Sequence, residues 1–74
     1  MRANNKVYRI TKLIAHILDY RDIRKSDWEY YFELNQDEHN KTINRDISEL
    51  KTLLYDIYGK QLVLNRKENH YELR

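Results

Sequence analysis

Residues 40–51 read Asn-Lys-Thr-Ile-Asn-Arg-Asp-Ile-Ser-Glu-Leu-Lys, and this stretch decides the fold. Its apolar residues recur at helical spacing and continue beyond it, so they share one side of a helix that turns about 100° per residue. These apolar residues are Ile43, Ile47, Leu50, Leu54 and Ile57. Gly59 follows them, where glycine commonly ends a helix in the left-handed conformation. The pattern predicts a helix over about 39–58, capped by Asp37 or Asn40.

The opposite side of this helix is polar and partly basic. On a helical wheel Arg45 and Ser48 lie within about 40° of Lys41. Asn44 and Lys51 lie within about 80° of it on one flank. Side chains of these types read base edges in the major groove or hold phosphates, which predicts a DNA-binding surface.

The flanks of the same helix carry a hydroxyl residue and two acidic residues. Thr42 stands on the shoulder, where a hydroxyl near a helix start can meet a phosphate. Asp46 and Glu49 lie on the neighbouring flank and make the helix net neutral. Composition alone therefore also fits a polar face that is simply solvated.

A first helix is predicted over about 5–21, with Asn4 or Asn5 as its cap. Its apolar residues follow spacings of three and four and are Val7, Ile10, Leu13, Ile14, Ile17 and Leu18. The residues expected on its opposite side are Arg9, Lys12 and His16.

A second, shorter helix is predicted over about 27–34. Ser26 followed by Glu29 forms the pattern of a capping box, which satisfies free backbone N–H groups at a helix start. One face of this helix is aromatic and consists of Trp28, Tyr31 and Phe32.

A wing is predicted over about 60–74, beyond the last helix. Alternation indicates two short strands, in which Leu62 and Leu64 share one face and Tyr71 and Leu73 another. The turn between the strands is polar and basic and presents Arg66 and Lys67. Three helices followed by a two-stranded β-hairpin wing predict an α+β, mostly α, winged helix-turn-helix, with residues 1–74 as a single domain.

Composition narrows the class of protein. The 74 residues include no cysteine and carry a formal net charge of +2, which permits nucleic-acid binding without demanding it. Residues 1–25 hold seven Lys and Arg against two Asp, whereas residues 26–38 hold five acids and no base. No apolar run approaches the roughly 20 residues that span a bilayer, so a cytoplasmic protein without membrane contact is expected.

No catalytic or metal-binding constellation is visible, so we expect neither an enzyme nor a cofactor or metal site. The residues expected to be surface histidines are His16, His39 and His70. The tyrosines expected to pack, rather than to stack on bases, are Tyr31, Tyr55, Tyr58 and Tyr71.

The run Lys-Thr-Ile-Asn-Arg-Asp-Ile-Ser-Glu-Leu at residues 41–50 resembles a known recognition-helix motif. The motif is Arg-Thr-Ile-x-Arg-Asp-Leu/Ile-x-x-Leu, from the DeoR-like winged helix-turn-helix that opens WYL-domain bacterial transcriptional regulators. The resemblance covers about Val7 to Leu73 and implies that Thr42, Asn44 and Arg45 enter the major groove of double-stranded DNA. The chain would then be an excised N-terminal domain or a stand-alone relative.

The chain departs from this family at three places. Glu38-His39-Asn40 stands where the family has Val-Ser, and His70 or Asn69 replaces the glycine of the wing. The second helix is acidic, with Asp27, Glu29 and Glu33. This acidity and the near-neutral total favour an alternative, in which the winged helix binds a protein and not DNA. A homodimer is also compatible with operator recognition.

The assignment of faces is tested by Ile47→Asp. Because this substitution places an unpaired charge on the apolar stripe, we expect the domain to be unfolded at 25 °C. Far-UV circular dichroism during a thermal scan measures the loss. A variant that keeps the wild-type melting temperature would show that Ile47 faces solvent.

Overall fold

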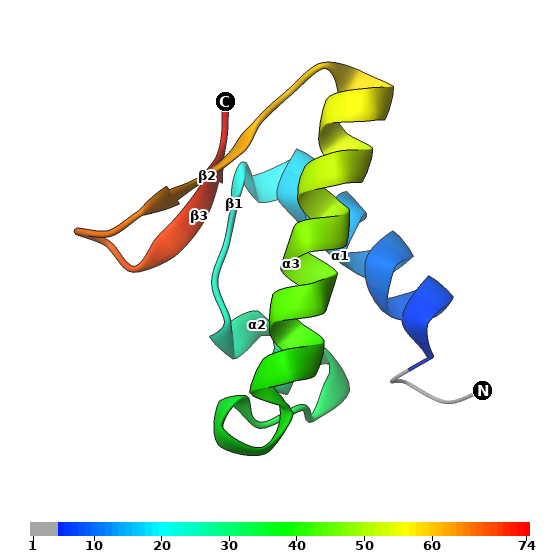
Figure 1. The fold of residues 1–74 in the computed structure, drawn as a ribbon, viewed down its shortest axis with the longest axis vertical. Coiled ribbons are helices and arrows are strands. Elements are labelled where there is room, and N and C mark those ends of the chain that lie inside the picture. The colour runs from blue at the N-terminus through cyan, green and yellow to red at the C-terminus, as the bar shows by residue number, and fades with distance from the viewer. Residues whose placement is uncertain (1–4) are drawn as a thin grey trace.

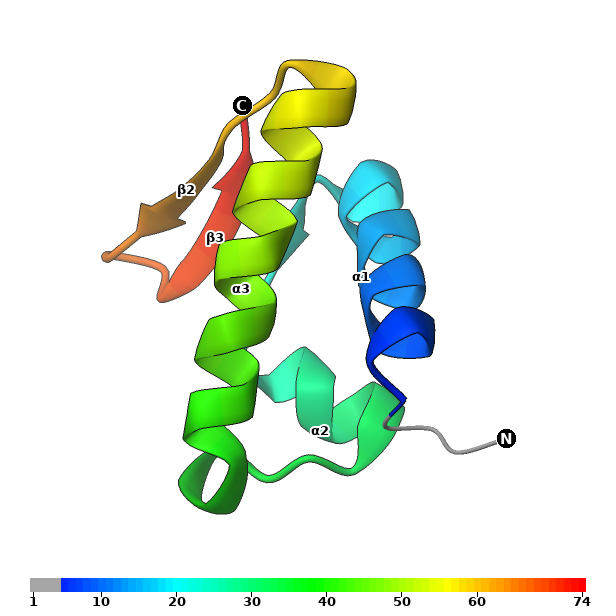
Figure 2. The same cartoon turned by 45° about the vertical axis from the view of Figure 1, so that its right-hand side comes forward.

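The computed structural model describes residues 5–74, which form three helices and a three-stranded antiparallel sheet (Figure 1). The elements in chain order are α1 (Lys6–Tyr20), β1 (Asp22–Ile23), α2 (Ser26–Phe32), α3 (Gln36–Tyr58), β2 (Leu62–Asn65) and β3 (His70–Leu73). The hairpin of β2 and β3 extends beside α3 as a wing (Figure 2). The predicted winged helix-turn-helix architecture is confirmed.

The sheet has one strand more than the sequence predicted. β1 pairs with β3, with Asp22 opposite Glu72 and Ile23 opposite Tyr71, and the strand order is β1-β3-β2. The chain reaches β1 through Arg21, which ends α1 in the left-handed conformation at φ 66°. A strand of two residues is too short to show alternation, so its pairing arises only from the tertiary fold.

The register of the wing corrects the predicted faces. Leu62 lies opposite Leu73, and Leu64 lies opposite Tyr71. Directly opposed residues share a face of an antiparallel sheet, so all four lie on the same face and not on two. Leu62 and Leu73 are buried in the core, which fixes this face toward the helices.

The helix caps agree with the sequence only in part. Asn5 caps α1 by accepting the Tyr8 N–H at 3.2 Å, whereas Asn4 lies outside the described residues. Asn35 caps α3, in place of the predicted Asp37 or Asn40. The predicted capping box is wrong, because Ser26 lies within α2 and makes no cap.

The turn between α2 and α3 is short. Glu33 ends α2 in the left-handed conformation at φ 57°, and Leu34 then packs into the core at 5% exposure. α3 begins at Gln36, three residues before the predicted start, but His39 interrupts it with φ −118° and ψ 26°. The predicted boundary therefore coincides with a kink inside the helix.

Among the described residues, thirteen apolar side chains form the core, including Ile43, Ile47, Leu50 and Leu54 of the predicted stripe. Trp28 and Phe32 are also buried, as predicted. Several residues predicted to pack are instead exposed: Val7, Leu18, Tyr55, Ile57 and Tyr58. Within residues 5–74, no helix combines the length and apolar character needed to cross a membrane.

A buried ion pair joins the three helices, contrary to the prediction that Arg9 faces solvent and Asp46 lies on an open flank. Arg9 Nε donates to Asp46 Oδ2 at 2.7 Å, and Arg9 Nη2 donates to Asp46 Oδ1 at 3.1 Å. Trp28 Nε1 donates to the same Oδ2 at 3.0 Å. Arg9 is 8% exposed and Asp46 1%. The carboxylate thus receives three hydrogen bonds, which offset the free-energy cost of burying its charge.

Removing one partner of this pair should destabilise the domain severely. We expect Asp46→Ala to lower the free energy of unfolding by about 3–5 kcal/mol, because Arg9 and the Trp28 N–H lose their acceptor. The double variant Arg9→Met/Asp46→Leu removes both charges and should recover part of that loss, because the Trp28 N–H still lacks its acceptor. Urea unfolding, monitored through the fluorescence of the single tryptophan, measures the free energy of unfolding of the wild type, the single variant and the double variant. Equal losses in the single and double variants would contradict this account.

The outer face of the sheet carries a polar cluster around Glu72. Asn65 Nδ2 donates to Glu72 Oε2 at 2.7 Å, and Arg74 Nη2 donates to Oε1 at 2.9 Å. His70 Nε2 lies 3.0 Å from Oε2, and this histidine is buried at 9% exposure, contrary to the surface position predicted. The side-chain hydrogen bonds from Asn65, His70 and Arg74 lower the pKa of Glu72 from 4.5 to about 2.

This lowered pKa predicts a pH-dependent contribution to stability. A carboxylate with a depressed folded-state pKa stabilises fully above its unfolded pKa, and that stabilisation is lost as the pH falls through the folded value. Glu72→Gln should therefore lower the melting temperature at pH 7. The difference from wild type should shrink below about pH 4.5 and vanish near about pH 2. Glu68→Gln, in the exposed turn of the wing, is the matched control. A difference that stays constant with pH would count against the cluster.

Candidate nucleic-acid interface

The exposed side of α3 is a ridge of polar side chains. Lys41, Asn44, Arg45 and Ser48 are all exposed, as predicted, and Thr42 is half-buried on the shoulder. The first four stand on the side of α3 opposite the core stripe, and in Figure 1 α3 lies in front of α1 and α2. The ridge is therefore open to a large partner along its whole length.

Two acids of α3, Asp46 and Glu49, have partners on α1. Asp46, predicted on the exposed flank, is buried against Arg9. Glu49 is paired with Lys6 of α1, whose Nζ lies 2.8 Å from the Glu49 carboxylate. Among residues 5–74, no ion pair involves Lys41 or Arg45. The ridge thus presents two cations that make no ion pair, although Asp37 and Glu38 in the first turn of α3 are exposed as well.

Lys51 connects the ridge with the wing. Its Nζ lies 5.6 Å from the centre of the Tyr71 ring of β3, within the range of a cation–π contact. Figure 2 shows the wing hairpin running beside α3. The predicted packing role of Tyr71 is confirmed, since it is partly buried against the core.

The wing turn presents the two predicted cations to solvent. Arg66 and Lys67 are exposed in the turn between β2 and β3. Asn65 Oδ1 accepts the Glu68 N–H at 3.0 Å, which orders the start of the turn. Asn69 adopts the left-handed conformation at φ 58°, which asparagine tolerates better than most residues other than glycine. Asn69 therefore allows the tight turn that brings the chain back into β3.

A cleft between the start of α2 and the wing was not predicted. It encloses about 440 Å³ and includes Arg24 and Lys25, which precede α2. Arg24 Nη2 lies 3.2 Å from His70 Nδ1, and Lys25 Nζ lies 3.5 Å from Asn40 Oδ1. The basic excess of residues 1–25 was the available sequence feature. It did not identify these two residues, because their place beside the wing depends on β1.

One acid of α2 faces the interior of the domain. Asp27 Oδ2 accepts the Arg24 N–H at 2.9 Å and lies 3.6 Å from His16 Nε2. Asp27 therefore stabilises the start of α2 and is only half-exposed, whereas Glu29 and Glu33 are exposed. His16, predicted at the surface, is also half-buried by this contact.

Among the described residues, no group of three or more His, Cys, Asp and Glu side chains is arranged to hold a metal ion. Comparison of the chain with protein-family models, with curated proteins and with solved structures found no match. The function proposed below therefore rests on the residues of the ridge, the wing and the cleft.

Proposed function

We propose that this domain binds double-stranded DNA sequence-specifically, as the DNA-binding domain of a cytoplasmic bacterial transcriptional regulator of the DeoR-like, WYL-associated type. The observation that supports it best is the ridge of α3, where Lys41 and Arg45 stand exposed without acidic partners beside a basic wing. The resemblance of residues 41–50 to the recognition-helix motif agrees with the same assignment.

In this proposal α3 enters the major groove, which is wide enough for a helix. Arg45 can donate two hydrogen bonds to a guanine edge, and Asn44 can make a two-point contact with adenine. Lys41, Thr42 and Ser48, also on α3, contact bases or phosphates. These residues supply direct readout together with backbone positioning.

The wing supplies contacts outside the major groove. Arg66 and Lys67 at its turn approach a phosphate backbone or the minor groove, and Lys51 holds the wing against α3 through Tyr71. Arg24 and Lys25, across the cleft from the wing turn, add two cations for phosphates. These contacts position the domain without reading sequence.

The second candidate is a winged helix that binds a protein. It is favoured by four exposed acids around the turn between α2 and α3, which would repel a DNA backbone that approached closely. These acids are Glu29, Glu33, Asp37 and Glu38.

The proposal is tested by measuring binding to a broad library of duplexes at several salt concentrations. Arg45→Ala should weaken binding to the preferred duplex by about 1–3 kcal/mol, or roughly 5- to 150-fold, and should relax preference at one base pair. Lys67→Ala should weaken binding to all duplexes similarly and reduce the salt slope by about 1. Lys60→Ala, an exposed cation at the far end of α3, is the matched control.

Two results would overturn the proposal. One is an absence of salt-dependent binding to any duplex by a folded wild-type domain. The other is equal loss of affinity in Arg45→Ala and Lys60→Ala, which would indicate a nonspecific charge effect. Either result would favour the protein-binding alternative.

A further inference from the structure

α1 has a second uncharged side that the core uses only in part, since Ile14 packs against the core while Val7 and Leu18 are exposed. Ile10, Leu13 and Ile17 are buried, but Val7 is 75% exposed and Leu18 36% exposed. On a helical wheel, these two residues and three other uncharged residues fall within an arc of about 100°. The complete row is Val7, Thr11, Ile14, Ala15 and Leu18. Single exposed apolar residues are common, but a continuous uncharged row along a helix is typical of an interface.

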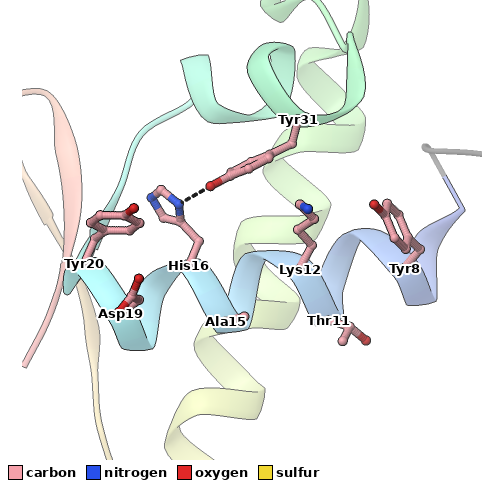
Figure 3. Close-up of a pocket in the computed structure, with 8 residues that line it drawn as sticks. All are labelled: Tyr8, Thr11, Lys12, Ala15, His16, Asp19, Tyr20 and Tyr31. Atoms are coloured by element: carbon pink, nitrogen blue, oxygen red, sulfur yellow. Dashed lines mark hydrogen bonds between the residues drawn. The ribbon is translucent and has the colours of Figure 1, made fainter.

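A groove of about 450 Å³ runs beside this row, between α1 and α2 (Figure 3). In Figure 3, Tyr31 of α2 points toward His16, and the dashed line marks the 2.7 Å hydrogen bond between them. Burial raises the pKa of the Tyr31 hydroxyl above its ordinary value. Lys12 Nζ lies 5.2 Å from the centre of the same ring. The wall of the groove is thus ordered by its own contacts.

The charges along the groove would be complementary to the same charges on a second, antiparallel copy of α1. Lys12 and Asp19 are both exposed on α1, and within residues 5–74 neither makes an ion pair. They are seven residues apart, about two helical turns, and Ala15 and His16 lie at the midpoint. A copy of α1 that ran in the opposite direction about this midpoint would place each cation beside an anion.

We propose that α1 pairs with α1 of a second copy of this chain, antiparallel, about a two-fold axis that passes between Ala15 and His16. The symmetry of such an interface makes each contact occur twice, so Lys12 of each copy meets Asp19 of the other. Leu18 packs between Thr11 and Ile14 of the opposite helix. The small side chain of Ala15 allows the helix axes to approach to about 8–10 Å. A parallel pairing would instead place Lys12 against Lys12.

The interface is small, so the dimer is weak. α1 is about 22 Å long, and its uncharged row buries less than the roughly 800 Å² per partner of a standard interface. Association therefore depends on protein concentration. The row is on α1, whereas the ridge is on α3, so this inference does not depend on DNA binding.

Sedimentation equilibrium over a concentration series, without DNA, tests the pairing. Wild type should show a monomer–dimer equilibrium, and Lys12→Glu and Asp19→Lys should each raise the dissociation constant at least about tenfold, because like charges then meet. An equimolar mixture of these two variants should associate again as a heterodimer. The double variant Lys12→Glu/Asp19→Lys should return close to wild type. Lys67→Glu makes the same charge change in the wing turn, far from α1 in Figure 2, and should leave the equilibrium unchanged.

A cross-linking experiment gives a second, independent measurement. Because the chain contains no cysteine, Ala15→Cys introduces a single thiol next to the proposed axis. Oxidation should convert this variant to a disulfide-linked dimer, whereas Lys67→Cys should cross-link far more slowly. Circular dichroism establishes that each variant is folded. A wild-type protein that stays monomeric throughout the series, a mixture that fails to associate, or equal cross-linking at both positions would overturn the proposal.

Discussion

The buried contact of Arg9 and Trp28 with Asp46 is the interaction on which the arrangement of the three helices depends. It takes one residue from each of α1, α2 and α3, and its geometry allows only one rotation of α3 about its own axis. That rotation turns Arg45, the residue that precedes Asp46, to solvent. The apolar stripe gives α3 its general orientation, and the ion pair makes that orientation unique.

The fold followed from sequence where a periodic pattern was long. The apolar stripe of α3, its end at Gly59 and the aromatic face of α2 were predicted, because each depends on residues close together in the chain. Arg9 and Asp46 were misplaced because a charged residue is expected at the surface unless a partner is known. Their pairing spans 37 positions and has no local signature. β1 was missed for the same reason, since β3 specifies it from the other end of the chain.

The candidate site was also predictable only where it lies on one element. The exposure of Lys41, Asn44, Arg45 and Ser48 followed from helical geometry alone, whereas Arg24 and Lys25 join the site through the fold of β1 and α2. The charge of the ridge required the structure as well. A sum over the sequence counts Asp46 and Glu49 as neutralising charges, but their actual partners are on α1.

The adjacency of Arg45 and Asp46 has a consequence for how this domain can change. Two neighbouring residues of opposite charge serve separate purposes, one anchoring the helix from within and the other meeting the exterior. Substitutions at Lys41, Asn44 or Ser48 leave the anchor intact, so the outward surface of α3 can diversify among descendants while the scaffold is inherited unchanged. An insertion of one residue before Arg45 would turn Arg45 toward the interior, and a deletion there would turn Asp46 to solvent, so either change would break the anchor.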